Sequence, residues 1–319
     1  MENEMNLLKS VQELEQWNCE DCDTQLMVLK ENQQQIQADA RIYYDETKDG
    51  QAIKRYYRKI EHQADKLSLF VQYHELITKT HKRRLPYFFS KDEYLYTWVD
   101  LHPDGSVQSI YSGEKKAPEA MIVRDYEIVK KRYEEFRLLL KKIRKSELNV
   151  EQKIKGIEQQ FKFNTEHVVP QSWFGAREPM KGDLHHLFVC QPECNTVRSN
   201  FPYADFPFYE PESPDELIQN HCGVAENGFF EPEYGKGTVA RAMLYFLLRY
   251  PTQIAKGVRR KIDVPLLIRW HKQFPATLYE RHRNQAIFLI QGNRNPFIDV
   301  PELAEHMVFP IKLIKNKAI

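Results

Sequence analysis

The chain has 319 residues, of which 42% are hydrophobic and 12% aromatic, and this composition excludes both a disordered chain and a small scaffold that depends on disulfides. Lysine and arginine number 46 against 45 aspartate and glutamate, so the formal net charge is +1. Near-neutrality excludes a protein that coats nucleic acid through bulk positive charge, although a local basic patch is compatible with it.

The N-terminal part of the chain is predicted to be helical. From Asn6 to about Ala40, apolar residues recur at helical spacing without proline or glycine. Residues 42–75 are also predicted to be helical, with a polar turn at Asp49-Gly50. We therefore predict a helical N-terminal segment over residues 1–90 and a second domain over residues 91–319.

The hydrophobic period changes after this segment. Tyr94–Ser112 is aromatic and β-branched on both sides of Pro103-Asp104-Gly105, a pattern typical of a short antiparallel hairpin. Residues 125–160 return to helical spacing, which predicts one long helix or a pair of helices.

The remaining elements surround a segment without helical spacing. Between Phe161 and Phe208, histidine, asparagine, cysteine and proline cluster. Beyond it, apolar spacing and proline boundaries predict helices at Thr238–Tyr250, Pro265–Gln273 and Leu278–Gln291. We predict an α+β protein, mostly helical, with its functional core at about 161–208.

The N-terminus and the cysteines bear on the compartment. Glu2 and Glu4 occupy the place of the basic region of a signal peptide, and five cysteines are an odd number, which favours reduced thiols over a disulfide framework. The longest strongly apolar run, Ala242–Leu248, is shorter than the roughly 20 residues that a membrane span needs. The sequence therefore predicts a cytoplasmic protein without a membrane partner, and export by another route is the alternative that it leaves open.

Residue types suited to phosphodiester hydrolysis gather in the core segment. The Glu166 carboxylate and the Asn195 carboxamide are hard oxygen ligands for a divalent cation. The neighbouring His167, as a neutral imidazole, can take a proton from an attacking water. One metal and one base are enough for this reaction.

The predicted local structure must bring these groups together. Adjacent strand residues point to opposite faces, so Glu166 and His167 serve one phosphate only if their strand bends or ends there. Leu187–Val189 predicts a second strand, and Pro192–Asn200 predicts a helix that begins at its proline. The chemistry requires this order of strand, strand and helix, with a metal between them.

Four segments in order, FNTEHVVPQSWFG, KGDLHHLFVCQPECNTVRSNFPY, KGTVARAMLYFLLRYP and ERHRNQAIFLIQGNRNPFID, resemble the bacterial endonuclease I family. The resemblance covers roughly residues 161–302, and it is weaker in the hairpin. It implies a small ββα-metal (His-Me finger) core, and non-specific cleavage of DNA, RNA or both to 5′-phosphate and 3′-hydroxyl ends. It also implies that His167 is the general base and that Glu166 and Asn195 bind Mg²⁺, with Mn²⁺ or Ca²⁺ as substitutes.

The chain departs from the family pattern at one place. Periplasmic members have a longer insertion that carries an arginine which contacts the cleaved phosphate, whereas only nine positions separate Trp173 from Gly182 here. Arg177 and Arg198 are both candidates for that catalytic contact.

The cysteines and the paired histidines have two readings each. Cys19 and Cys22 form half of a zinc site. A second group of residues could hold a structural Zn²⁺ or be buried thiols, and the thiols are favoured; it comprises Cys190, Cys194, Cys222 and His221. His185 and His186 are expected on the second strand, where one orients a ligand or serves the structure alone.

Two other functions compete with the nuclease. One is a nucleic-acid-binding module that retains the fold without turnover, and the other is a metal-dependent phosphoesterase for small substrates. The presence of Glu166, His167 and Asn195 together speaks against a binding module, which needs no such set. The sequence identifies no inhibitor or regulatory partner.

Overall fold

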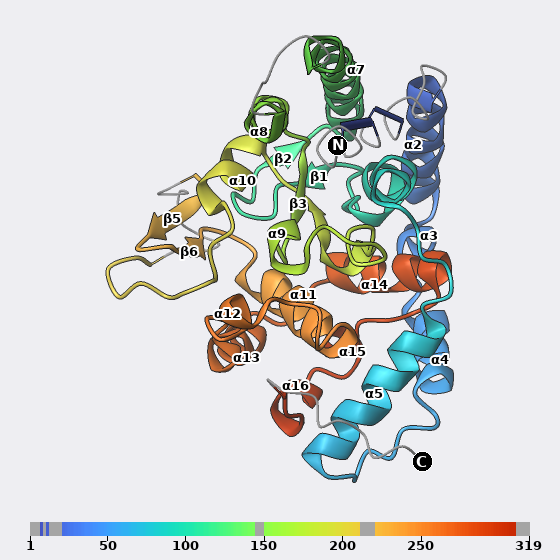
Figure 1. Cartoon of the computed structure of the whole chain (residues 1–319). Helices are drawn as coiled ribbons and strands as arrows, with labels where there is room; N and C mark the ends of the chain where they lie inside the picture. Colours follow the sequence, from blue (N-terminus) through green and yellow to red (C-terminus); the bar gives the residue numbers. More distant parts are fainter. Residues whose placement is uncertain (1–6, 9–10, 13–20, 144–149, 211–220, 311–319) are drawn as a thin grey trace.

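The computed structural model describes residues 7–8, 11–12, 21–143, 150–210 and 221–310. Helices dominate them, and the strands form three short antiparallel pairs. This confirms the predicted α+β class with a mostly helical chain. In Figure 1, strand β3 (Thr165–His167) lies in the middle of the molecule, and the N-terminal helices lie along one edge.

The N-terminal helices are α2 (Asp21–Ala38), α3 (Ala40–Tyr43), α4 (Glu46–Tyr56) and α5 (Lys66–Thr80). The turn predicted at Asp49-Gly50 is wrong, because both residues lie inside α4. Asp49 is 2% exposed and pairs with the Arg294 guanidinium at 2.9 Å. This tertiary contact outweighs the cost of about 1 kcal/mol for a glycine within a helix.

The prediction of a strand for the first arm of the hairpin is also wrong. Residues 87–99 form α6 (Tyr87–Phe89) and the π-helical η1 (Ser90–Val99), because Leu95, Tyr96 and Val99 all enter one core. The predicted turn is present, with the His102 amide donating to the Ser106 carbonyl. After it, β1 (Val107–Gln108) pairs instead with β2 (Lys115–Lys116).

The predicted helical stretch before the core segment is a pair, α7 (Pro118–Ile143) and α8 (Val150–Gln160). Within the core segment follow β3, α9 (Gln171–Phe174), the 3₁₀ turn η2 (Leu184–His186), β4 (Leu187–Val189) and α10 (Pro192–Arg198).

The C-terminal part contains one hairpin and several helices. They are β5 (Gly223–Glu226), β6 (Phe229–Pro232), α11 (Lys236–Arg249), α12 (Lys256–Arg259), α13 (Val264–Gln273), α14 (Leu278–Gln291), α15 (Pro296–Asp299) and α16 (Leu303–His306). The three helices predicted here are confirmed as α11, α13 and α14. Nearly every side chain of α11 is buried, so this helix is the centre of the larger core.

Candidate active site

The predicted order of strand, strand and helix is present. Strands β3 and β4 are antiparallel, with His167 opposite Leu187, and α10 begins with Pro192 in its first turn. The Asn195 side-chain nitrogen donates to the Thr165 carbonyl at 3.0 Å, which ties α10 to β3. Backbone pairing and this single amide contact therefore fix the three elements against one another.

A cleft of about 700 Å³ opens over these elements and brings four of the five predicted residues together. It is lined by Glu166, His167, Asn195 and Arg198. Glu166 and His167 reach the same cleft although they are adjacent, because β3 ends at His167 and the chain turns into α9 after Pro170. The required end of the strand is thus present.

Glu166 is a buried carboxylate with two polar neighbours. The Tyr111 hydroxyl donates to Oε1 at 2.8 Å, and Arg198 Nε lies 3.2 Å from the same oxygen. Burial raises the pKa of Glu166 to about 7, although the Arg198 guanidinium and the Tyr111 hydroxyl act to lower it. A bound divalent cation would act in the same direction as Arg198 and Tyr111 and favour the ionised carboxylate.

The hydrogen bonds of His167 select its tautomer. Nε2 lies 2.9 Å from the Lys181 carbonyl, and because a carbonyl only accepts, this nitrogen carries the proton. Nδ1 therefore holds the lone pair and faces the Gln171 amide nitrogen at 3.2 Å. Burial, with the nearby His186 adding to it, lowers the pKa of His167 well below its ordinary value. The ring is thus the neutral form that a general base requires.

The oxygen atoms of the site suit a hard cation. Asn195 uses its nitrogen toward Thr165, which leaves its carboxamide oxygen for another partner. Tyr111 and Arg198 both contact Oε1 of Glu166, and the His167 backbone amide also hydrogen-bonds to this carboxylate. Across the described ranges, no three histidine, cysteine, aspartate or glutamate side chains gather as a metal site. Glu166 and Asn195 are the cleft residues that could hold a divalent cation through oxygen atoms.

The two candidate arginines are placed very differently. Arg198 lines the cleft, is 0% exposed, and donates to the Val168 carbonyl at 2.7 Å. Arg177 is exposed, donates to Gln253 at 3.1 Å, and is not among the residues that line the cleft. The structure brings Arg198 to the site and leaves Arg177 outside it.

Several residues of the cleft were not identified from the sequence. The positively charged ones are Arg132, Lys162 and Lys181, and the polar ones include Gln171; Tyr111 contacts Glu166 from outside the core segment. Lys181 directly precedes the Gly182-Asp183 motif, which was a usable signal. Arg132 lies in a basic stretch, residues 130–144, that suits a phosphate track but is also typical of a solvated helix face. Tyr111 carries no such signal, since it is far from the motif in sequence.

The paired histidines lie in η2 and not on a strand, which corrects the prediction. Asp183 caps this turn through the His185 amide, and its other carboxylate oxygen accepts the Tyr245 hydroxyl at 2.8 Å. The His186 ring packs edge-on against His167 at 5.5 Å between centroids. His186 therefore packs against the His167 ring, whereas the His185 ring packs against Tyr245.

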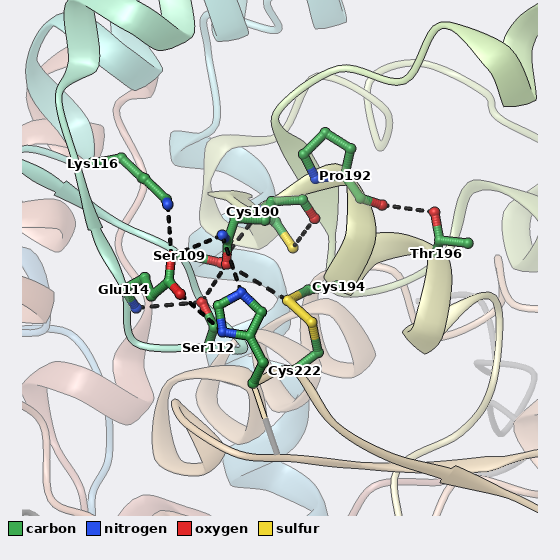
Figure 2. The surroundings of a disulfide bond; sticks show 11 residues. Ser109, Ser112, Glu114, Lys116, Cys190, Pro192, Cys194, Thr196 and Cys222 are labelled. Atoms are coloured by element: carbon green, nitrogen blue, oxygen red, sulfur yellow. Dashed lines mark hydrogen bonds and ion pairs between the residues drawn. A yellow bond between two sulfur atoms is a disulfide. The ribbon is translucent and has the colours of Figure 1, made fainter. Parts of the chain in front are cut away.

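Cys194 and Cys222 form a disulfide, which corrects the preference for thiols in this group (Figure 2). It joins α10 to the residue before β5, next to Asn195 in sequence. Cys190 is a buried free thiol. Of the other pair, Cys22 is half-buried and free, and Cys19 lies outside the described residues. An odd number of cysteines is compatible with one bond between segments that the fold brings together.

Comparisons with known proteins identify the family of this chain and several relatives. A family model described as Endonuclease I matches residues 71–302. An extracellular deoxyribonuclease of Aeromonas hydrophila is 30% identical over 166 residues, covering 46% of this chain and 68% of the relative. A periplasmic deoxyribonuclease of the same organism is 30% identical, covering 42% and 62%.

A further relative is named for a different substrate. An extracellular ribonuclease of Bacillus amyloliquefaciens is 30% identical over 161 residues, covering 46% of this chain and 53% of the relative. This chain thus spans about half to two thirds of the length of the relatives that it matches.

The predicted cytoplasmic localisation is wrong. The relatives are described as extracellular or periplasmic, and the Cys194–Cys222 disulfide is typical of an oxidising compartment. In the described part of the chain, none of the helices combines the length and apolarity of a membrane span.

Proposed function

The chain belongs to the endonuclease I family, and from this premise we propose that it is an exported, metal-dependent, non-specific endonuclease. It hydrolyses phosphodiester bonds of DNA, RNA or both, leaving 5′-phosphate and 3′-hydroxyl ends. The observation that carries the proposal is that Glu166, His167 and Asn195 line one cleft. A binding module has no use for a buried neutral imidazole beside a carboxylate and a carboxamide.

The proposed chemistry divides between the cleft residues. Glu166 and Asn195 would hold Mg²⁺. When bound, this cation supplies positive charge that neutralises the phosphate and the leaving oxygen. His167 accepts a proton from the attacking water at Nδ1, while its Nε2 stays bound to the Lys181 carbonyl. Arg198 positions the Glu166 carboxylate. Because these groups act on the backbone, little sequence preference is expected.

We expect metal-dependent cleavage that is lost in His167→Ala. The purified chain is incubated with supercoiled plasmid and with single-stranded RNA, in Mg²⁺ and in EDTA. Loss of a general base should lower the rate by at least about a hundredfold. His271→Ala is the matched control, because His271 is also buried and its Nε2 also contacts a backbone carbonyl, that of Pro301, at 2.8 Å. His271 is not among the residues that line the cleft.

Thermal melts of both variants separate chemistry from folding. Wild-type rates in folded His167→Ala would reject the assignment of the base. Binding of either polymer without cleavage by the wild-type chain would favour the binding module.

A further inference from the structure

The catalytic cleft has an aromatic half that the proposed chemistry does not use. Its aromatic side chains come from α6, from α7 and from the residues just before β3, and they are Tyr87, Phe88, Phe136 and Phe163. They line the same cleft as Glu166 and His167. A reaction at the phosphate needs no aromatic wall, so these residues have another role or serve packing alone.

Packing accounts for three of these rings more completely than for Phe88. Tyr87, Phe136 and Phe163 are 5%, 2% and 7% exposed and belong to a hydrophobic core, whereas Phe88 packs against this core while only partly buried. Phe88 is half-buried and meets Phe163 edge-on, with centroids 5.8 Å apart and planes at 86°. Part of its ring is therefore accessible from the cleft.

Arg132 adds a planar cation to this half. Its guanidinium carbon lies 4.4 Å from the Phe163 centroid, and its Nε donates to the Phe161 carbonyl at 2.6 Å. A second donation, to the Glu158 carbonyl at 3.1 Å, fixes the group in one orientation. A guanidinium held in this way is a stacking surface for a nucleobase.

The aromatic half is directly connected to the catalytic base. The Lys181 carbonyl accepts from His167 at 2.9 Å, and the Lys181 ammonium lies 5.8 Å from the Phe88 centroid. Lys181 thus borders both the aromatic half of the cleft and the half that holds His167. Its positive charge suits a backbone phosphate that lies between a bound nucleobase and the cleaved bond. The cleft volume of about 700 Å³ is in the range of sites that hold a ligand larger than a phosphate.

We propose that Phe88 and Arg132 form a subsite for a nucleobase next to the cleaved phosphate. The inference rests on the proposed function and names its substrate more closely. A base in a duplex is paired and stacked, so it reaches this wall only after leaving the helix, at a cost of a few kcal/mol. Unpaired strands incur no such cost, and the protein therefore cleaves single-stranded DNA or RNA in preference to duplex.

The first test compares substrates in variants of one ring. Phe88→Ala should lower kcat/KM on single-stranded DNA roughly tenfold, which is the scale of base stacking on an aromatic side chain, and change duplex cleavage by less than about twofold. Phe88→Trp should retain or raise the single-strand rate. Phe89→Ala is the matched control, because Phe89 is the next residue, is 36% exposed and contacts Tyr94 outside the cleft. Equal losses on both substrates in folded Phe88→Ala would overturn the subsite.

The second test removes a nucleobase from the substrate and leaves the Phe88 ring in the protein. A single-stranded oligonucleotide with one abasic position is compared with the intact strand. The wild-type chain should cut beside the abasic position roughly tenfold more slowly, whereas Phe88→Ala should cut both strands equally. Equal cutting by the wild-type chain rejects the subsite, even when Mg²⁺-dependent cleavage is normal.

Failure of the proposed function gives a different result. In that case, neither polymer is cleaved in Mg²⁺ and His167→Ala is indistinguishable from the wild-type chain. Binding of the intact and abasic strands is then measured at equilibrium with the wild-type chain and Phe88→Ala. Weaker binding of the abasic strand by the wild-type chain alone supports the subsite, and equal binding overturns it.

Discussion

At the scale of single residues, the orientation of the site's side chains depends on the hydrogen bonds and ion pairs that each of them makes. Glu166 uses Oε1 toward Tyr111 and Arg198, and Asn195 uses its nitrogen toward Thr165. Carboxylate and carboxamide oxygens are the ligands that Mg²⁺ prefers. These contacts fix the orientation of both side chains.

We therefore expect Glu166→Gln and Asn195→Ala to raise the Mg²⁺ concentration that gives half the maximal rate, by about tenfold or more. Gln in place of Glu keeps the volume and removes one charge, which avoids a collapse around Arg198. Excess Mg²⁺ should partly restore the rate of both variants. Cleavage is measured over a series of Mg²⁺ concentrations.

Val197→Ala is the control for this experiment, since Val197 is on the same helix and is 39% exposed. It should follow the wild-type Mg²⁺ curve. A Mg²⁺ curve for Glu166→Gln or Asn195→Ala that also coincides with the wild-type curve would contradict the role of that residue as a ligand.

What the sequence predicts at this scale depends on distance along the chain. Glu166 and His167 are adjacent, so their residue types alone indicated hydrolysis. Tyr111 reaches Glu166 across 55 positions, and Arg132 reaches the cleft from α7. An ordinary tyrosine or arginine in a helical or loop pattern has no local feature that indicates such a contact, so only the folded chain reveals it.

At the scale of elements, α10 is anchored by contacts of two adjacent residues. Asn195 holds it to β3, and the disulfide holds Cys194 to Cys222 at a Cα separation of 4.9 Å. Around the bond, Ser112 donates to Gln191 at 2.6 Å, and the His221 ring lies 2.9 Å from Glu114. Figure 2 shows this layer of polar contacts beside the disulfide.

We expect the double variant Cys194→Ser and Cys222→Ser to lose about 3 to 4 kcal/mol of unfolding free energy, because the bond closes a loop with a sequence separation of 28. Looser anchoring of α10 should also raise the Mg²⁺ requirement through Asn195. Denaturant unfolding and the Mg²⁺ series measure the two effects.

Dithiothreitol provides the internal control for the disulfide. It should lower the stability of the wild-type chain to that of the double variant and leave the variant unchanged. Cys22→Ser, which removes a free thiol, should behave as the wild-type chain does. Equal stability of the oxidised chain and the double variant would contradict a stabilising bond.

Elements with a strong local signal were predicted correctly, and those decided by packing were not. Pro192 marks the start of α10 and Thr277 caps α14, so both helices follow from the sequence. Tyr94–Val99 has the aromatic content of a strand, yet burial of Leu95 and Tyr96 in one core makes it helical. Here tertiary packing outweighs strand propensity.

At the scale of the whole molecule, the N-terminal helices are joined to the C-terminal segment by buried polar contacts. Arg294 binds Asp49 of α4 at 2.9 Å and Asp299 of α15 at 2.7 Å. The Tyr57 hydroxyl donates to Asp299 at 2.9 Å. The helical segment predicted over 1–90 is therefore held to the rest of the chain at the side chain of Arg294, which is 0% exposed.

We expect Arg294→Met to destabilise the whole chain by about 3 to 5 kcal/mol, because it leaves two buried carboxylates without their cation. The matched control is Arg281→Met. Arg281 lies in α14 and pairs with Glu46 of α4 at 3.7 Å, but the two side chains are 48% and 83% exposed. An exposed pair contributes less than about 1 kcal/mol, so only the first variant should shift the midpoint of denaturant unfolding strongly.

If far-UV circular dichroism and tryptophan fluorescence shift together in Arg294→Met, the N-terminal helices unfold with the catalytic part. Separate transitions, or equal effects of the two variants, would show that this buried cluster does not couple them.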